Sequence, residues 1–166
     1  MIGSTGSGKT TFARLLGERL GVPHVELDAF HWRSGWVESP TEELRAQVAA
    51  VLERDDWVID GNYGSRLGTS VLDQADEVVW VDPPFATTFW RLLRRTVRRA
   101  RTREHLWGTT NAESFRRSFL SRDSILWYLV KTYRRGRRRR AELVAGRPHV
   151  RLRSAREVEQ YLREAG

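Results

Sequence analysis

Residues 3–10 read GSTGSGKT and match the pattern G-x-x-x-x-G-K-[S/T], in which a glycine-rich loop connects a buried strand to a helix. We expect the three glycines of this loop to adopt positive φ angles, so that backbone N–H groups approach phosphate oxygens closely. Lys9 is expected to reach the β- and γ-phosphates of a nucleotide, and the Thr10 hydroxyl to contact Mg²⁺. The residues expected to bind the nucleotide are Gly3, Ser4, Thr5, Gly6, Ser7, Gly8, Lys9, Thr10 and Thr11.

The segment before this loop is too short for the strand that such a loop requires. Met1 and Ile2 alone precede Gly3, whereas a mean strand has about 5–6 residues. Because the strand that feeds the loop is central in a parallel sheet, its loss would leave backbone groups unpaired on both sides. We therefore expect the native protein to carry several more apolar residues before Ile2, with the first strand largely missing from this chain.

The composition indicates one globular domain that spans residues 1–166, with 40% apolar and 30% charged residues. The absence of cysteine excludes disulfides, thiol catalysis and cysteine-based metal sites. The sequence contains no apolar run of about 18 residues, so it predicts no membrane span. Its glycine- and serine-rich start does not resemble a signal peptide. We expect a cytoplasmic protein with no membrane partner.

Arginine dominates the basic residues. The chain has 29 lysines and arginines against 21 acidic residues, a net charge of +8, and its two lysines are Lys9 and Lys131. An excess of positive charge indicates an anionic partner, either a nucleotide or a nucleic-acid backbone, although a coding bias toward arginine would explain the arginine content equally well. The run Arg134–Arg140 is either an exposed, solvated tract or a surface that contacts phosphate groups of nucleic acid.

Helical and extended patterns alternate after the loop. Gly21 is expected to end the first helix, and capping boxes at Ser39–Glu42 and Ser154–Glu157 predict the starts of two others. The first helix is expected to bury Phe12, Leu15, Leu16 and Leu20 on one face.

Continuous apolar runs are typical of strands that are covered on both faces. Alternating strands and helices therefore predict an α/β fold: a three-layer domain with a parallel sheet and helices on both sides. Strands are expected at residues 24–28, 57–60, 77–82 and 149–153, a helix from 84 to about 103, and a long helix that carries Phe119 and Ile125 and ends in the basic run.

Three aspartates are predicted to stand at strand ends, where a carboxylate can serve Mg²⁺ on a nucleotide. Asp60, which closes the run WVIDG, is assigned this metal role, whereas Asp82 before two prolines is expected to cap a helix. Asp28 is either a loop-turn residue or a group that accepts the proton of an attacking hydroxyl or holds Mg²⁺. Trp32 and Trp36, which follow it, either stack on a base or cover the core.

Arg91, Arg95 and Arg98 fall on one face of the predicted helix at 84–103. One of these arginines could stack on adenine and another neutralise the transferring phosphate, while a solvated helix face is the alternative. The polar stretch at about 101–118 is expected to be a lid-like insertion that closes over the phosphates. It is flanked by Arg101, Arg103, Arg116, Arg117 and Arg122.

The order of the segments GSTGSGKT, LDAFHW, WVIDGNY, VVWVDPPF, RLLRR and SFLSRDSILWYLVKTYRRGRRR resembles that of the adenylate kinase-like P-loop proteins. Within them the chain is most similar to the small group named DNA topology modulation proteins. This resemblance implies a P-loop kinase-like fold with a helical lid region, a magnesium role for Asp60, adenine contact by Arg91 and phosphate contact by Arg95.

The chain departs from nucleoside monophosphate kinases after Asp60. Those kinases continue Asp-Gly with Phe-Pro-Arg, whereas this chain reads GNYGSR and displaces its arginine to Arg66. Asp28 instead resembles the aspartate of shikimate- and gluconate-type kinases, which phosphorylate a hydroxyl. These residues predict an ATP- and Mg²⁺-dependent kinase that transfers the γ-phosphate to a small acceptor, with a nucleotide as the first expectation and a small hydroxyl compound as the other. The predicted catalytic residues are Lys9, Asp28, Arg91 and Arg95.

Two other functions stay open. The chain could be a DNA-associated regulatory ATP-binding protein or ATPase without a small-molecule acceptor, which Arg134–Arg140 and the net charge favour. It could also be a relative that lost activity together with its first strand.

Overall fold

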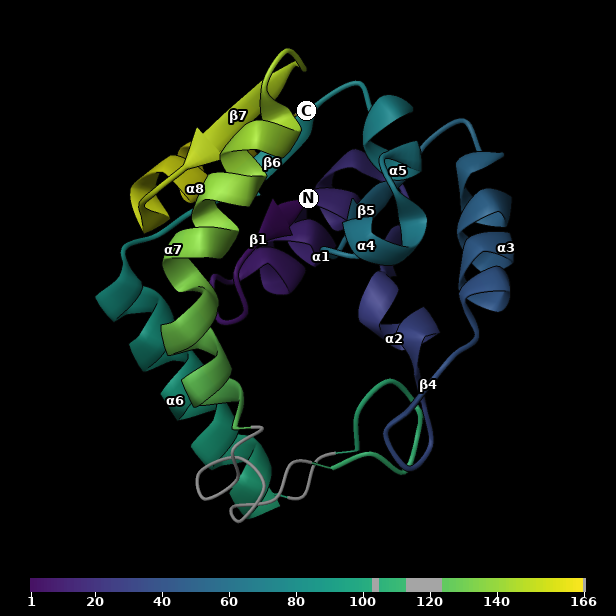
Figure 1. The fold of residues 1–166 in the computed structure, drawn as a ribbon. Helices are drawn as coiled ribbons and strands as arrows, with labels where there is room; N and C mark the ends of the chain where they lie inside the picture. The colour runs from purple at the N-terminus through teal and green to yellow at the C-terminus, as the bar shows by residue number, and fades with distance from the viewer. Residues whose placement is uncertain (103–104, 113–123, 166) are drawn as a thin grey trace.

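The computed structural model describes residues 1–102, 105–112 and 124–165, and it is an α/β protein with a small parallel sheet and flanking helices (Figure 1). The strands are β1 (Ile2–Gly3), β2 (His24–Glu26), β3 (Trp32–Arg33), β4 (Val37–Glu38), β5 (Val58–Asp60), β6 (Val78–Val81) and β7 (His149–Leu152). The helices are α1 (Lys9–Leu20), α2 (Leu27–His31), α3 (Thr41–Leu52), α4 (Gly64–Leu67), α5 (Ser70–Asp73), α6 (Phe85–Thr102), α7 (Ile125–Val144) and α8 (Ala155–Glu164).

The two-residue strand β1 lies between two longer strands. On one side it pairs in parallel with β6, which pairs in turn with β7. On the other side the Gly61 N–H donates to the Met1 carbonyl at 3.3 Å, and the Met1 nitrogen donates to the Ile59 carbonyl. Since β5 also pairs in parallel with β2, the strands run in the order β2, β5, β1, β6, β7 across the molecule. The strand before the glycine-rich loop therefore stands between β5 and β6, as the sequence predicts, although strand pairing divides the predicted single sheet into β1–β6–β7 and β2–β5.

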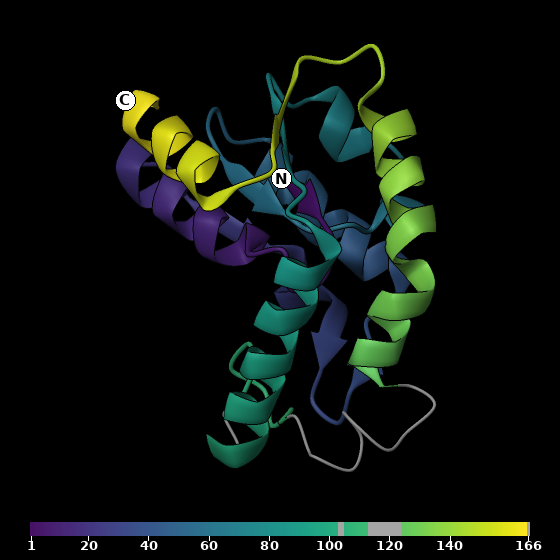
Figure 2. The same cartoon turned by 90° about the vertical axis from the view of Figure 1, so that its left-hand side faces the viewer.

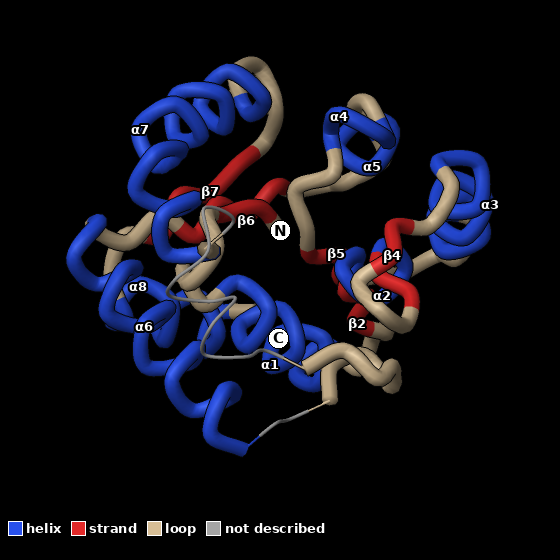
Figure 3. Tube along the Cα trace, turned by 60° about the horizontal axis from the view of Figure 1, so that its bottom comes forward, coloured by secondary structure: helices blue, strands red, loops and turns tan. Residues whose placement is uncertain are grey.

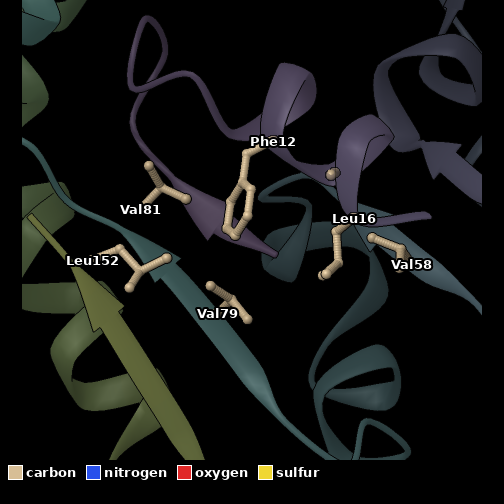
Figure 4. Close-up of a cluster of buried hydrophobic side chains, with 7 residues drawn as sticks. Phe12, Leu16, Val58, Val79, Val81 and Leu152 are labelled. Atoms are coloured by element: carbon tan, nitrogen blue, oxygen red, sulfur yellow. The ribbon is translucent and has the colours of Figure 1, made fainter. Parts of the chain in front are cut away.

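Helices α1 and α8 cover one face of the strands and lie side by side there (Figure 2). Phe12 of α1 points toward Val79 and Val81 of β6, with Leu152 of β7 beyond them, and Leu16 lies beside Val58 of β5 (Figure 4). The apolar face predicted for α1 is partly wrong, because Leu15 and Leu20 are exposed and Ala13 and Gly17 take their places in the interior. Gly21 ends the helix with φ 70°, as predicted.

Other helices cover the opposite face. The alternate β6 residues Val78 and Trp80 pack with Ile2 and with Val144 of α7. Ile59 of β5 packs against α3 and α4 in a separate cluster. All four residues of β6 are buried, so the apolar run at this strand is covered on both sides, as expected.

One of the two predicted capping boxes forms. The Ser154 hydroxyl accepts from the Glu157 N–H at 3.2 Å at the start of α8. The box at Ser39–Glu42 is wrong: α3 begins at Thr41 after Pro40, and the buried Ser39 hydroxyl donates instead to the Phe30 carbonyl at 2.7 Å. Ser39 thereby ties the loop before α3 to the end of α2.

Two expected element boundaries also differ. The second strand ends at Glu26, so Asp28 lies inside the short helix α2 and does not stand at a strand end. The long helix α7 begins at Ile125, and Phe119 lies outside the described residues, as do Arg103, Arg116, Arg117 and Arg122 of the expected lid. Within the described ranges, no helix has the length and apolar content needed to cross a membrane.

Candidate functional site

The glycine-rich loop turns at two of its three glycines. Gly6 and Gly8 have φ angles of 78° and 94°, which other residues adopt with difficulty. Gly3 does not share this conformation, contrary to expectation, because it is part of β1. Close packing explains why glycine stands at position 3. A Cβ there would lie 2.6 Å from the Ser7 hydroxyl oxygen and 2.7 Å from the Val81 carbonyl oxygen.

The loop ends at an open helix terminus. Gly8 is the N-cap of α1, and no side chain caps the helix. The first turn also contains no acidic residue, so its N–H groups and the positive end of the helix dipole face the loop without a carboxylate from the helix itself.

Helix α6 packs against the loop and contacts it through two arginines. A Cβ at Gly6 would lie 2.8 Å from both the Leu92 Cβ and the Thr88 carbonyl oxygen, so the close packing of loop on helix requires glycine. The Arg91 guanidinium donates to the Ser7 carbonyl at 3.1 Å, and Arg95 donates to the Thr5 hydroxyl at 3.4 Å. The two arginines predicted from spacing therefore lie at the loop.

Lys9 and Asp60 meet beneath the loop. The Lys9 Nζ lies 3.9 Å from Asp60 Oδ1, and His24 Nε2 lies 3.5 Å from Oδ2. Burial of Asp60 would raise its pKa, but the neighbouring His24, the Lys9 charge and the Thr10 hydroxyl outweigh burial and hold the pKa below its usual value. Asp60 is thus a charged carboxylate in the interior, surrounded by the residues that the sequence pattern predicts for Mg²⁺ and phosphate.

The Asp60 carboxylate suits a magnesium ion. Its side chain is fully buried, and neither oxygen has a hydrogen-bond partner in the part of the chain that the structure describes. Lys9 Nζ at 3.9 Å and His24 Nε2 at 3.5 Å leave these oxygens without a close hydrogen bond, so a metal ion or another donor can still bind them. The described residues contain no cluster of three or more His, Cys, Asp or Glu side chains, so Mg²⁺ would use Thr10, Asp60, phosphate oxygens and water.

Asn62 fastens β1 from the side of β5. Its amide nitrogen donates to the Gly3 carbonyl, and its amide oxygen accepts from the Gly3 N–H at 3.4 Å. This side chain therefore supplies hydrogen bonds that a longer neighbouring strand would supply. The sequence alone predicts no such role, because Asn62 stands out there only as a departure from the kinase pattern.

Asp28 lies in a separate polar group next to the loop site. The Tyr63 hydroxyl donates to Asp28 Oδ1, and the Tyr63 ring stands 4.6 Å from that of His31. Burial and the Asp28 charge raise the Tyr63 pKa, so the phenol keeps its proton. Asp28 is therefore oriented by Tyr63, and no contact joins it to Lys9 or the arginines of α6 within the described residues.

Arg66 has a structural position. Its guanidinium contacts His31 Nδ1 at 2.6 Å, the Thr41 hydroxyl at 3.0 Å and the Ser39 carbonyl, and it lies 3.6 Å from Glu38. These contacts join α4 to the segment before α3. The Arg66 side chain is thus held by contacts within the protein.

Trp32 and Trp36 belong to a chain of edge-to-face aromatic contacts that includes Trp107. Both rings are half-buried, which suits stacking on a base as well as covering the core.

Asn111 joins the described part of the expected lid to the β3–β4 hairpin: its amide accepts from the Trp36 N–H and donates to the Arg33 carbonyl, each at 2.8 Å. Trp107 also donates to Glu26, whose pKa burial raises.

The basic run on α7 divides into different environments. Arg137 donates to Asp82 at 2.9 Å, and Arg151 of β7 donates to the same buried carboxylate. Asp82, expected to cap a helix, is therefore the centre of an ion-pair group. Arg139 and Arg140 line a cavity, Arg140 as a half-buried and Arg139 as an exposed residue, and Arg134, Arg135 and Arg138 are exposed as well.

The structure brings together most of the residues predicted for nucleotide binding. Comparison with protein-family models, with curated proteins and with solved structures found no match. The geometry therefore carries the argument for function: Lys9, Thr10 and Asp60 meet below the loop, and Arg91 and Arg95 contact it from α6.

Proposed function

We propose that the chain is a Mg²⁺-dependent P-loop phosphotransferase of the adenylate kinase-like type, which moves the γ-phosphate of ATP to a small acceptor. One observation carries the proposal: the fully buried carboxylate of Asp60 lies 3.9 Å from Lys9 at the base of a loop that two arginines contact. Each of these groups suits a polyphosphate with its metal ion. A cytoplasmic location stays part of the proposal.

The residues of the site would act by positioning and by charge. The loop N–H groups and Lys9 would bind the phosphates, and Thr10 and Asp60 would hold Mg²⁺, which neutralises charge on the phosphate oxygens. Arg91 and Arg95 would contact nucleotide and transferring phosphate from the side of α6. Since catalysis of this kind needs orientation more than covalent chemistry, the rigid packing of Gly6 on α6 supports it.

Asp28 would receive the proton of the attacking group. The acceptor oxygen forms a bond to the γ-phosphorus, the bond from that phosphorus to the β–γ bridging oxygen breaks, and ADP leaves with the electron pair. The hydroxyl proton passes to the Asp28 carboxylate, which Tyr63 orients through its hydrogen bond.

The test is ADP production from Mg-ATP by the full chain, alone and with a panel of nucleoside monophosphates, nucleosides and hydroxy acids. We expect the rate to rise at least tenfold with one acceptor class and to disappear without Mg²⁺. A slow rate that is indifferent to every acceptor would contradict the transferase and favour an ATPase.

A DNA-associated ATP-binding protein is the second candidate, favoured by exposed arginines of α7 that include Arg134, Arg135 and Arg138. If DNA is the partner, the affinity for duplex DNA falls steeply with salt concentration. Replacing Arg134, Arg135 and Arg138 by Gln should then reduce that salt dependence. Salt-insensitive or undetectable DNA binding would exclude this candidate.

A further inference from the structure

A cavity of about 220 Å³ opens beside the glycine-rich loop. Ser4 and Thr5 lie at one wall, the segment after β5 forms another, and α7 forms the third. The helix α7 and the pair α4–α5 stand on either side of the N-terminal strand, which the tube view shows from below (Figure 3). Since Thr5 also contacts Arg95, the cavity adjoins the site proposed for ATP.

The cavity walls combine apolar surface with positive charge. Most of the surface comes from aliphatic and aromatic side chains of α4, α5, α7 and β5, such as Leu67, Val71 and Leu129. Arg139 and Arg140 are the charged side chains among its lining residues in the described chain, and no carboxylate accompanies them there. Such a cavity favours a ligand with an apolar body and a negative group.

Arg140 lacks a partner for its charge. Its Nε is buried without a hydrogen bond, and within the described residues its guanidinium makes no hydrogen bond or ion pair. Asp82, whose charge acts on Arg140, accepts hydrogen bonds from Arg137 and Arg151 instead. Burial lowers the Arg140 pKa, and the Asp82 charge opposes this shift.

The Arg140 guanidinium packs against the backbone of Gly136. A Cβ at Gly136 would lie 3.2 Å from Arg140 Nη1, so the planar group packs across the bare backbone one turn earlier on α7. A glycine inside a helix is unfavourable by about 1 kcal/mol relative to alanine. The absence of a side chain at Gly136 therefore leaves room for the Arg140 guanidinium beside the cavity.

We propose that this cavity binds a small molecule that carries one anionic group, a carboxylate or a phosphate, on an apolar or planar body, with the anion on Arg140. Because Ser4 and Thr5 form its inner wall, the molecule is the phosphoryl acceptor. The acceptor role rests on the proposed function, whereas anion binding by Arg140 does not.

Calorimetric titration of the full chain without ATP tests the binding at constant ionic strength. The carboxylate probes are cyclohexanecarboxylate and 3-hydroxybenzoate, with cyclohexanecarboxamide as the neutral counterpart. The phosphate probes are phenyl phosphate and AMP, with adenosine as the neutral counterpart. The variant Arg140→Gln is compared with Arg138→Gln, which removes the same charge from an exposed position on the same helix.

We expect one probe class to bind at least tenfold more tightly than its neutral counterpart, and Arg140→Gln to abolish that difference. Arg138→Gln should retain it. Equal losses in both variants would show a long-range charge effect and overturn the site, and so would anions that bind no better than the neutral molecules.

Thermal unfolding shows whether Arg140→Gln still folds. Removal of an unpaired buried cation is expected to leave the unfolding midpoint unchanged or higher. The variant Lys9→Ala separates this inference from the proposed function: it should bind the anion normally while losing phosphoryl transfer. If Lys9→Ala and the wild type both bind the anion but neither transfers phosphate, the acceptor role falls and the binding site stands.

Discussion

The Lys9 ammonium lies 3.9 Å from the carboxylate of Asp60, a side chain with no exposed surface. The two residues are 51 positions apart in the sequence. Lys9 is the first residue of α1, and Asp60 is the last residue of β5. Burial alone would favour a neutral Asp60, but its neighbours keep its pKa low. The neighbours of Asp60 thus favour its charged state in the protein without any ligand, which is the state that the proposed Mg²⁺ role requires.

The arginines of α6 provide a matched comparison on one helix. Arg91→Gln and Arg95→Gln each remove a donor to the loop, so we expect kcat/KM for ATP to fall about tenfold or more in each. Arg94→Gln removes the same charge from an exposed position and should change kcat/KM less than twofold. Steady-state kinetics on the three variants decides this, and equal effects in all three would indicate general electrostatics.

Gly6 is expected to be intolerant of any side chain. Gly6→Ala requires a positive φ of 78° for alanine and places its Cβ 2.8 Å from a backbone oxygen of α6, so the free energy of unfolding should fall by about 2 kcal/mol or more. Gly64→Ala is the control, because nothing lies within 4 Å of the place that its Cβ would take and its φ is ordinary. Denaturant titration measures both, and a Gly6→Ala variant as stable as the wild type would disprove the close packing.

The lowered pKa of His31 leads us to expect that the stability of the fold depends on pH. Burial lowers its pKa below the ordinary 6.5, and the nearby Arg66 acts in the same direction against the opposing charge of Glu38. The unfolded chain therefore binds this proton more readily than the folded protein, and stability falls as pH drops below about 6.5. His31→Gln keeps an acceptor for Arg66 and removes the titration.

The unfolding midpoint of wild type and His31→Gln between pH 7.5 and 5.5 checks this effect. We expect the midpoint of the wild type to fall more than that of the variant over this interval. Parallel curves would show that His31 contributes nothing to the pH dependence.

Local patterns predicted the centre of the site well. The motif spacing placed Lys9 and Thr10 at the start of a helix, the run WVIDG placed Asp60 at the end of a buried strand, and helical spacing put Arg91 and Arg95 on one face. These features depend on residues near one another in the chain, where spacing alone determines which side chains share a face or an edge.

Contacts between distant segments could not be predicted in the same way. The clamp of Asn62 on Gly3 and the unpaired Arg140 depend on which elements become neighbours in space. Ser39 shows the same limit, since a carbonyl of α2 competes for the hydroxyl that a local pattern assigns to a cap. Asp28 also differs, because the chain turns into a helix two residues before the expected end of the strand.

The central claim is that the loop binds Mg-ATP through Lys9, and the most direct measurement is calorimetric titration of the full chain with ATP in the presence of Mg²⁺. Lys131, the other lysine of the chain, is exposed on α7 and gives the matched control. We predict that Lys9→Ala weakens ATP binding at least a hundredfold while Lys131→Ala binds as the wild type does. Equal affinity in Lys9→Ala and the wild type, with both proteins folded, would contradict this claim.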